Sequence, residues 1–162
     1  MIKKIYLDMD GVLSDFEKQF GDLYGAEALK NRDRKLWTEQ WPDFIENKQF
    51  EVLPKFPGCD ELLTFIRNHP EIEVEILTSS GGVKFHEQVK QQKKVWLKKY
   101  CIAYKPHVVP GRKHKKDYAT PETILIDDTE DVIESFNKAG GIGILHKDVK
   151  DTIKTLETLL NK

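Results

Sequence analysis

The chain has 162 residues, which suits one well-buried core with a small inserted module and makes two independent domains a tight fit. Its 26 basic and 27 acidic residues give a net charge of −1, which excludes the strongly basic character typical of nucleic-acid and membrane binding. No apolar run approaches about 18 residues, so a transmembrane helix is not expected. The two cysteines form no CxxC motif, and we expect reduced thiols and a cytoplasmic location.

Short apolar segments alternate with longer amphipathic segments along most of the chain. The predicted strands cover residues 3–9, 74–80, 123–128 and 140–146, with a weaker candidate at 107–111. The predicted helices cover residues 59–69, 86–101, 129–140 and 148–162, where apolar side chains recur at helical spacing. This alternation predicts an α/β fold, a Rossmann-like parallel sheet with helices on both faces.

One segment after the first strand breaks this alternation. Residues 16–57 contain no convincing strand, but they are rich in large aromatic side chains, among them Trp37, Trp41, Phe44, Phe50 and Phe56. We therefore expect a small helical cap at 16–57, inserted into a core formed by residues 1–15 and 58–162.

Three predicted strands end in polar residues: Asp8 with Asp10, Thr78 with Ser79, and Asp127 with Asp128. In an open parallel sheet, ligands bind where the carboxyl ends of the strands meet. If the three strands are neighbours, four carboxylates and two hydroxyl groups converge at this edge. Because carboxylates repel one another, such a cluster requires a cation, and an all-oxygen ligand set favours Mg²⁺.

The spacing of Asp8 and Asp10 fits phosphoryl transfer. Strand alternation places both side chains on the same side, and Gly11 permits a tight turn directly after them. Asp8 could attack phosphorus to form an aspartyl-phosphate, while Asp10 protonates the leaving alkoxide and then deprotonates water. Mg²⁺ and a lysine would neutralise the phosphoryl oxygens, and Thr78 would bind the phosphoryl group.

Each motif alone has a simpler interpretation. A single DxD at a strand end is often a turn, and a DD before a helix is usually an N-cap, here Asp128 or Thr129. Their occurrence together, each after an apolar strand, favours a site. Four histidines without metal-ligand spacing are interpreted as surface or packing residues: His69, His86, His107 and His146.

The sequence DMDGVLSD at 8–15 resembles the DxDGVxxD signature of the haloacid dehalogenase superfamily of phosphatases. ILTSS at 76–80 resembles the second motif of that superfamily, and ILIDD at 124–128 resembles the fourth. More narrowly, the chain is similar to the 5′(3′)-deoxyribonucleotidases, whose DMDGVLADFE and WVEKY segments resemble DMDGVLSDFE and WLKKY here. Their TSP motif resembles Thr78-Ser79, with Ser80 in place of proline.

The resemblance implies catalytic and metal-binding roles for four acidic residues. Asp8 would be the nucleophile and Asp10 the general acid and base. The Mg²⁺ ligands would be Asp8, the carbonyl group of Asp10 and Asp127, with Asp128 beside them. These roles agree with those expected from the strand ends.

The resemblance also implies contacts with the substrate. Thr78 and Ser79 would bind the phosphate, while Phe16 and Trp37 match cap aromatics that enclose the nucleoside. The family has phenylalanine where Leu36 stands, so the base pocket differs here. The alternative is that the cap aromatics simply form the core of the cap.

Several lysines could bind the phosphate. Lys113, Lys115 and Lys116 precede the fourth motif, but none matches the spacing of the family without a small insertion. We favour Lys115, because it begins the turn that contains Tyr118, which we expect to pack inward. Lys116 and Lys93 remain alternatives.

The residues and the resemblance together predict a Mg²⁺-dependent phosphomonoesterase that acts through an aspartyl-phosphate. The favoured partner is a small-molecule phosphomonoester, a ribo- or deoxyribonucleoside monophosphate, with no membrane partner. Alternative substrates are a nucleic-acid 3′-phosphate end, a sugar phosphate or a phosphoprotein. A further alternative is a non-catalytic module that binds Mg²⁺ or a partner. The sequence leaves the oligomeric state open.

Overall fold

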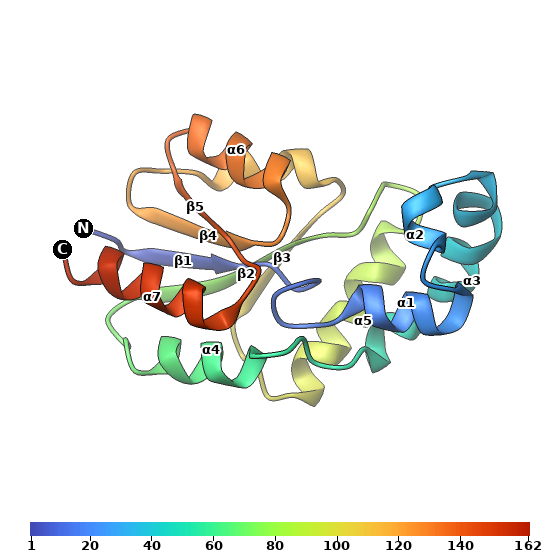
Figure 1. Ribbon diagram of the computed structural model, residues 1–162, viewed down its shortest axis with the longest axis horizontal. Helices are drawn as coiled ribbons and strands as arrows, with labels where there is room; N and C mark the ends of the chain where they lie inside the picture. Colours follow the sequence, from blue (N-terminus) through green and yellow to red (C-terminus); the bar gives the residue numbers. More distant parts are fainter.

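The computed structural model describes residues 1–162 and contains one five-stranded sheet (Figure 1). Its strands are β1 (Lys4–Leu7), β2 (Glu73–Ser79), β3 (Lys105–Val109), β4 (Thr123–Asp127) and β5 (Ile142–Leu145). All strand pairings are parallel, and the order across the sheet is β3-β2-β1-β4-β5. The three strands with polar ends, β2, β1 and β4, are therefore neighbours, and the predicted α/β fold is confirmed.

Helices cover both faces of the sheet, as its side-chain alternation requires. The covering segments are α4 (Cys59–Arg67), α5 (His86–Lys99), a 3₁₀ segment (Arg112–Tyr118), α6 (Glu130–Lys138) and α7 (Val149–Leu160). Leu7 and Ile126 belong to a buried cluster that includes apolar residues of α4, α5 and α7. Leu125, which points to the other face, packs in a second cluster with residues of α6.

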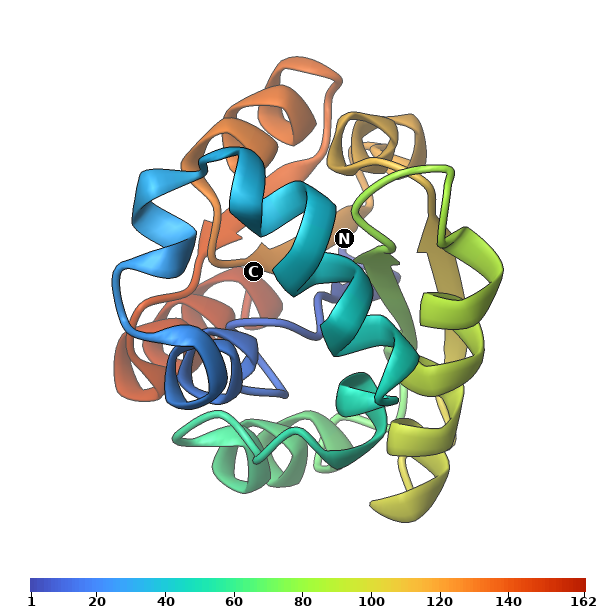
Figure 2. The ribbon, with the colours of Figure 1, turned by 90° about the vertical axis from the view of Figure 1, so that its right-hand side faces the viewer.

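The chain between β1 and α4 is helical, as expected. It forms α1 (Phe16–Tyr24), α2 (Ala28–Asn31), a π-helical turn (Leu36–Gln40), α3 (Trp41–Glu46) and a 3₁₀ turn (Gln49–Val52). We call residues 16–57 the helical segment. It lies beyond the carboxyl ends of the strands, while both chain termini lie at the opposite end of the molecule (Figure 1). Figure 2 views the molecule from the side of the helical segment, which lies in front of the sheet.

The helical segment shares its apolar core with the sheet. Phe44 of α3 is fully buried in the same 25-residue cluster as Leu7 and Ile126. Two side chains of α5 also hold the segment through its backbone: Gln92 Nε2 donates to Ile45 O at 2.7 Å, and Trp96 Nε1 donates to Leu53 O at 2.8 Å. The division into a core and a separate cap stays a prediction.

One strand of the sheet begins earlier than the sequence predicts. The weak strand candidate at 107–111 is the edge strand β3 at Lys105–Val109 and therefore begins two residues earlier. Pro106 lies inside this strand, because an edge strand tolerates a residue without an N–H donor.

None of the helices combines the length and the apolar character needed to cross a bilayer.

Candidate active site

Three carboxylates meet at the carboxyl edge of the sheet. Asp8 follows β1, Asp127 ends β4 and Asp128 comes next, and one oxygen of each lies within 4.8 Å of the others. Asp8 and Asp127 are buried, whereas Asp128 reaches the surface. Gly11 makes this approach possible, because its φ is +86° and a Cβ atom there would lie 2.0 Å from Asp128 Oδ2.

Lys115 is the lysine that the fold brings to these carboxylates. Its Nζ lies 3.1 Å from Asp8 Oδ1 and 2.6 Å from Asp127 Oδ2, and the residue is only 3% exposed. Lys113 and Lys116, its neighbours in the same 3₁₀ segment, are exposed. Asp8 and Asp127 raise the pKa of Lys115 even though burial lowers it. Lys115 is therefore a fixed positive charge in the cluster.

One lysine does not balance three carboxylates. Burial, and then the neighbouring Asp127, raise the pKa of Asp8 well above its usual range, and Lys115 only opposes this shift. Burial and Asp127 also raise the pKa of Asp128 to about 6. This cluster of hard oxygen donors with excess negative charge fits Mg²⁺, which prefers oxygen ligands. Asp8, Asp127 and Asp128 are the side chains that could hold it.

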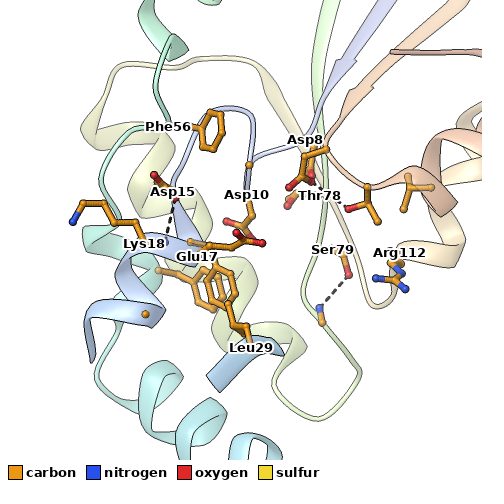
Figure 3. Close-up of a pocket in the computed structure, with 18 of the residues that line it drawn as sticks. Asp8, Asp10, Asp15, Glu17, Lys18, Leu29, Phe56, Thr78, Ser79 and Arg112 are labelled. Carbon is orange, nitrogen blue, oxygen red and sulfur yellow. Dashed lines mark hydrogen bonds between the residues drawn. The ribbon is translucent and has the colours of Figure 1, made fainter. Parts of the chain in front are cut away.

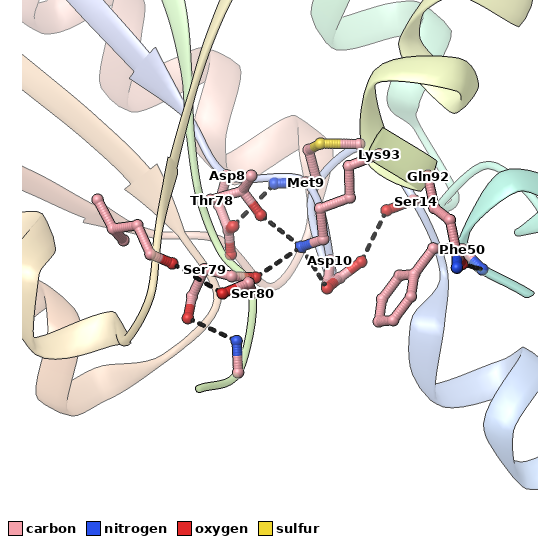
Figure 4. A network of polar contacts seen from close by, with 12 residues as sticks. Asp8, Met9, Asp10, Ser14, Phe50, Thr78, Ser79, Ser80, Gln92 and Lys93 are labelled. Atoms are coloured by element: carbon pink, nitrogen blue, oxygen red, sulfur yellow. Dashed lines mark hydrogen bonds and ion pairs between the residues drawn. The ribbon is translucent and has the colours of Figure 1, made fainter. Parts of the chain in front are cut away.

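Asp10 is not one of the three clustered carboxylates and belongs to a second network, formed with Lys93 and Ser14 (Figure 4). Lys93 of α5 donates from Nζ to Asp10 Oδ2 at 3.0 Å, to Thr78 Oγ1 at 2.6 Å and to Ser79 O at 2.9 Å. Ser14 Oγ donates to Asp10 Oδ1 at 3.1 Å, so both carboxylate oxygens of Asp10 are engaged. A metal contact through the main chain of Asp10 stays a prediction.

Lys93 is the site residue whose contacts were hardest to predict from the sequence. It is 1% exposed and is separated by 83 positions from its partner Asp10. The only sequence signal was its place just before the WLKKY segment, which made it an alternative phosphate-binding lysine. In the fold it links Asp10 to Thr78, between the end of β1 and the end of β2.

A cavity of about 1200 Å³ opens over the two networks and is lined by the sheet edge and by the helical segment (Figure 3). Trp37 lines it and is 49% exposed. Phe16 also lines it but packs against four other aromatic rings, those of Phe20, Trp41, Phe44 and Phe50. Phe16 is thus packed among the aromatic rings of the segment, whereas Trp37 contacts one ring, that of Trp41, edge-on at 6.3 Å and leaves about half of its surface exposed to a ligand.

Three further residues clarify the limits of the site. Phe56 and Arg112 line the cavity (Figure 3), although no sequence motif singled them out as site residues. Arg112 forms an ion pair with Asp131 at 2.9 Å. Asp15, the last acid of the DMDGVLSD stretch, caps α1 by accepting a hydrogen bond from Lys18 N at 3.2 Å, so it is a structural member of that motif.

No protein-family model matches the sequence, and no curated protein matches it. Solved structures do match. A haloacid dehalogenase-like family hydrolase from Xanthomonas campestris is 15% identical with a TM-score of 0.63, and the match covers 98% of this chain and 91% of that one. A hydrolase from Streptococcus pneumoniae TIGR4 is 19% identical with a TM-score of 0.59, over 96% of this chain and 98% of that one.

A third similar structure carries ligands. It is a haloacid dehalogenase family enzyme from Bacteroides thetaiotaomicron, crystallised as an aspartate-to-alanine mutant in complex with magnesium and inorganic phosphate. It is 16% identical with a TM-score of 0.53, over 91% of this chain and 95% of that one. At these identities the comparison concerns the architecture. The chain has the α/β fold of the haloacid dehalogenase-like hydrolases.

Proposed function

We propose that the chain is a Mg²⁺-dependent phosphomonoesterase that dephosphorylates ribo- or deoxyribonucleoside monophosphates through an aspartyl-phosphate on Asp8. The observation that carries this proposal is the convergence of Asp8, Asp127, Asp128 and Lys115 beneath the cavity. The magnesium and phosphate in the Bacteroides enzyme of the same fold support it. The aromatic lining of the cavity, including the exposed face of Trp37, supports a substrate with a nucleobase.

Asp8 is arranged to act as a nucleophile. Its Oδ1 accepts a hydrogen bond from Met9 N at 2.8 Å and lies 3.1 Å from Lys115 Nζ, and neither contact uses Oδ2. Oδ2 forms the new bond to phosphorus as the ester P–O bond breaks. Mg²⁺ bound by Asp8, Asp127 and Asp128 would neutralise charge on the phosphoryl oxygens.

The second network supplies the proton transfers and holds the phosphoryl group. Asp10 gives a proton to the leaving alkoxide, and it later takes one from the water that attacks the aspartyl-phosphate and frees Asp8. Lys93 and Ser14 fix the direction of the Asp10 carboxyl group for both steps. Thr78 and Ser79 hold the phosphoryl oxygens, while Lys115 stabilises their charge.

The experiment is phosphate release from a panel of substrates, with and without Mg²⁺. The panel contains ribo- and deoxyribonucleoside monophosphates, p-nitrophenyl phosphate, a sugar phosphate, a phosphopeptide and a 3′-phosphorylated oligonucleotide. We expect Mg²⁺-dependent turnover with a preference for nucleoside monophosphates. Asp8→Asn should lower kcat by about 10³-fold or more, because it removes the nucleophile. The matched control is Asp60→Asn, an exposed acid outside the cavity, which should leave kcat unchanged.

The possible results separate the parts of the proposal. Wild-type turnover in Asp8→Asn would refute the mechanism. Turnover of p-nitrophenyl phosphate without preference for any nucleotide would refute the nucleotide substrate and retain the phosphatase. Activity confined to the oligonucleotide would identify a polymer end as the substrate instead.

A further inference from the structure

The loop between β2 and α5 contains two successive glycines in the left-handed half of backbone space. Gly81 has φ +78° and Gly82 has φ +142°, and Ser80 separates them from Ser79 at the end of β2. Glycine loses more conformational freedom than any other residue when it is ordered, so two in succession make a loop that needs external restraint. In the proposed mechanism this loop follows the residues that hold the phosphoryl group.

Ser80 restrains the loop from the side of the sheet. It is 2% exposed, and its backbone N–H donates to Val109 O of β3 at 2.9 Å. Its Oγ lies 3.0 Å from Gly82 O and 2.7 Å from His86 Nδ1, at the start of α5. A hydroxyl group has one proton, so both short contacts are satisfied when His86 donates from Nδ1 and Ser80 donates to Gly82 O. His86 therefore anchors the loop through Ser80.

Trp41 restrains the same loop from the side of the helical segment. A Cβ atom at Gly81 would lie 2.8 Å from Trp41 Cζ2, so the backbone of Gly81 packs directly against the indole. Trp41 itself is held by edge-on contacts with Phe16 at 5.9 Å and Phe50 at 5.8 Å between ring centroids. The loop is thus held on one side by the contacts of Ser80 and on the other by the indole of Trp41.

The shape of the loop sets the position of Ser79. Gly81 N donates to Ser79 Oγ at 3.1 Å, and Ser79 O accepts a hydrogen bond from Lys93 at 2.9 Å (Figure 4). A change in the loop therefore changes the direction of the Ser79 hydroxyl group. In the TSP motif that Thr78-Ser79 resembles, proline stands at the position of Ser80, and its ring would limit backbone freedom. In this chain the contact between Ser80 and His86 restrains the loop.

We propose that Ser80 and His86 are positioning residues that hold the glycine loop against Trp41, in the one shape that lets Ser79 and the loop bind the phosphoryl group. This inference rests on the proposed phosphomonoesterase function. It assigns a role to His86, which the sequence alone led us to interpret as a surface or packing residue. Neither residue touches the reacting atoms, so the expected effect is on phosphate affinity rather than on the chemical step.

The experiment compares Ser80→Ala, His86→Leu, the double variant and His86→Asn, which keeps a polar atom at the place of Nδ1. We expect Ser80→Ala and His86→Leu to raise KM and the inhibition constant of inorganic phosphate about threefold to tenfold, the range of one hydrogen bond, with kcat unchanged. The double variant should lose no more than Ser80→Ala, because Ser80→Ala already removes the contact with His86 together with the contact to Gly82 O. His86→Asn should recover most of the affinity, and Glu87→Gln on the adjacent exposed position is the control.

A second measurement, amide hydrogen exchange at Gly81, whose N–H donates to Ser79 Oγ, does not depend on turnover. We expect faster exchange at this amide in Ser80→Ala and His86→Leu, with the exchange of the β2 amides unchanged. Unchanged phosphate affinity together with unchanged exchange would overturn the inference, as would a fall in Tm without any change in KM. If the wild type hydrolyses no phosphomonoester, the proposed function fails; exchange then decides whether the pair restrains the loop, and inorganic phosphate binding decides whether the loop receives phosphate.

Discussion

Buried carboxylates at two places in the same sheet have opposite electrostatic surroundings. At the carboxyl edge, Asp8 lies beside Asp127 and Asp128, and burial together with Asp127 raises its pKa well above the usual range. Further down β2, Glu75 is equally buried, but it accepts from Lys4 and lies 2.6 Å from His107 Nε2. Although burial raises its pKa, these partners hold the pKa of Glu75 below its ordinary value.

This difference in surroundings distinguishes a carboxylate that stabilises the fold from carboxylates that a ligand site would require. Glu75 has a cation on one side and a histidine on the other, so its charge is favourable in the folded chain. The charge of Asp8 is unfavourable there, because Lys115 alone faces a group of acids. Selection for stability alone would not retain this excess of negative charge. The crowded edge is therefore best explained by a ligand that brings positive charge.

Among variants that keep the nucleophile Asp8, Lys93→Met should give the largest effect, because Lys93 links Asp10 at the end of β1 to Thr78 of β2. Lys93→Met keeps most of the side-chain volume but leaves Asp10 and Thr78 without their shared partner. General acid and base catalysis contributes about 10²–10⁴-fold, so we expect kcat to fall by about 10²-fold or more when Asp10 loses its orientation. Steady-state kinetics on the best substrate of the panel measures this.

The control for this variant is Lys94→Met, the exposed neighbour on α5, which should leave kcat unchanged. A circular dichroism spectrum and a Tm for each variant separate loss of catalysis from loss of fold. If a folded Lys93→Met variant keeps the wild-type kcat, then the orientation of Asp10 does not depend on this lysine.

Glu75 should affect stability and not turnover. Glu75→Gln leaves Lys4 without its buried counter-charge and His107 without its carboxylate partner, and we expect a loss of about 1–3 kcal/mol in the free energy of unfolding at pH 7. Because its pKa is lowered on folding, the stabilisation is present above the unfolded pKa of about 4.3 and disappears as the pH falls through the folded pKa. In urea unfolding, the loss of stability relative to wild type should be smaller at pH 3.5 than at pH 7.

Two variants sharpen this comparison. Glu73→Gln, the more exposed partner of Lys4, should change stability little, because surface ion pairs contribute little. Asp8→Asn should stabilise the metal-free protein at pH 7, the opposite sign to Glu75→Gln, because it removes a charge whose pKa the fold raises. Destabilisation by Asp8→Asn of similar size would erase the distinction between the two groups.

Trp37 should give the smallest effect. Its ring lines the cavity and is half exposed, so Trp37→Ala removes a surface for stacking without opening the core. We expect KM for a nucleoside monophosphate to rise about threefold to tenfold with kcat unchanged, since the contact is the same in ground and transition states. Leu23→Ala, equally exposed and outside the cavity, is the control. An unchanged KM would make Trp37 a structural residue of the helical segment.

Much of the fold and part of the site could be predicted because they depend on local pattern. Apolar runs that end in Asp8, Thr78 and Asp127 predicted three strands, and the rule that ligands bind at the carboxyl edge predicted where their ends would meet. The edge strand β3 begins two residues before the predicted segment 107–111 and includes Pro106, which an edge position accepts.

The rest depends on contacts between distant residues. Adjacent lysines in one basic stretch look alike in sequence, and only the packing of the 3₁₀ segment buries Lys115 and leaves Lys116 exposed. The pairing of Lys93 with Asp10 and the clamp on Gly81 by Trp41 join elements whose separation no local pattern encodes. Likewise, aromatic composition predicted a helical segment, but not that Phe16 would be packed among four rings while Trp37 faces the cavity.

The continuous core between the sheet and the helical segment constrains how molecules come and go. Swinging the segment outward as a lid would strip Phe44 from its neighbours and break the bonds from Gln92 and Trp96 to the backbone. We therefore expect substrate and product to enter and leave at the open edge of the cavity, near the half-exposed ring of Trp37, while the helical segment stays in place.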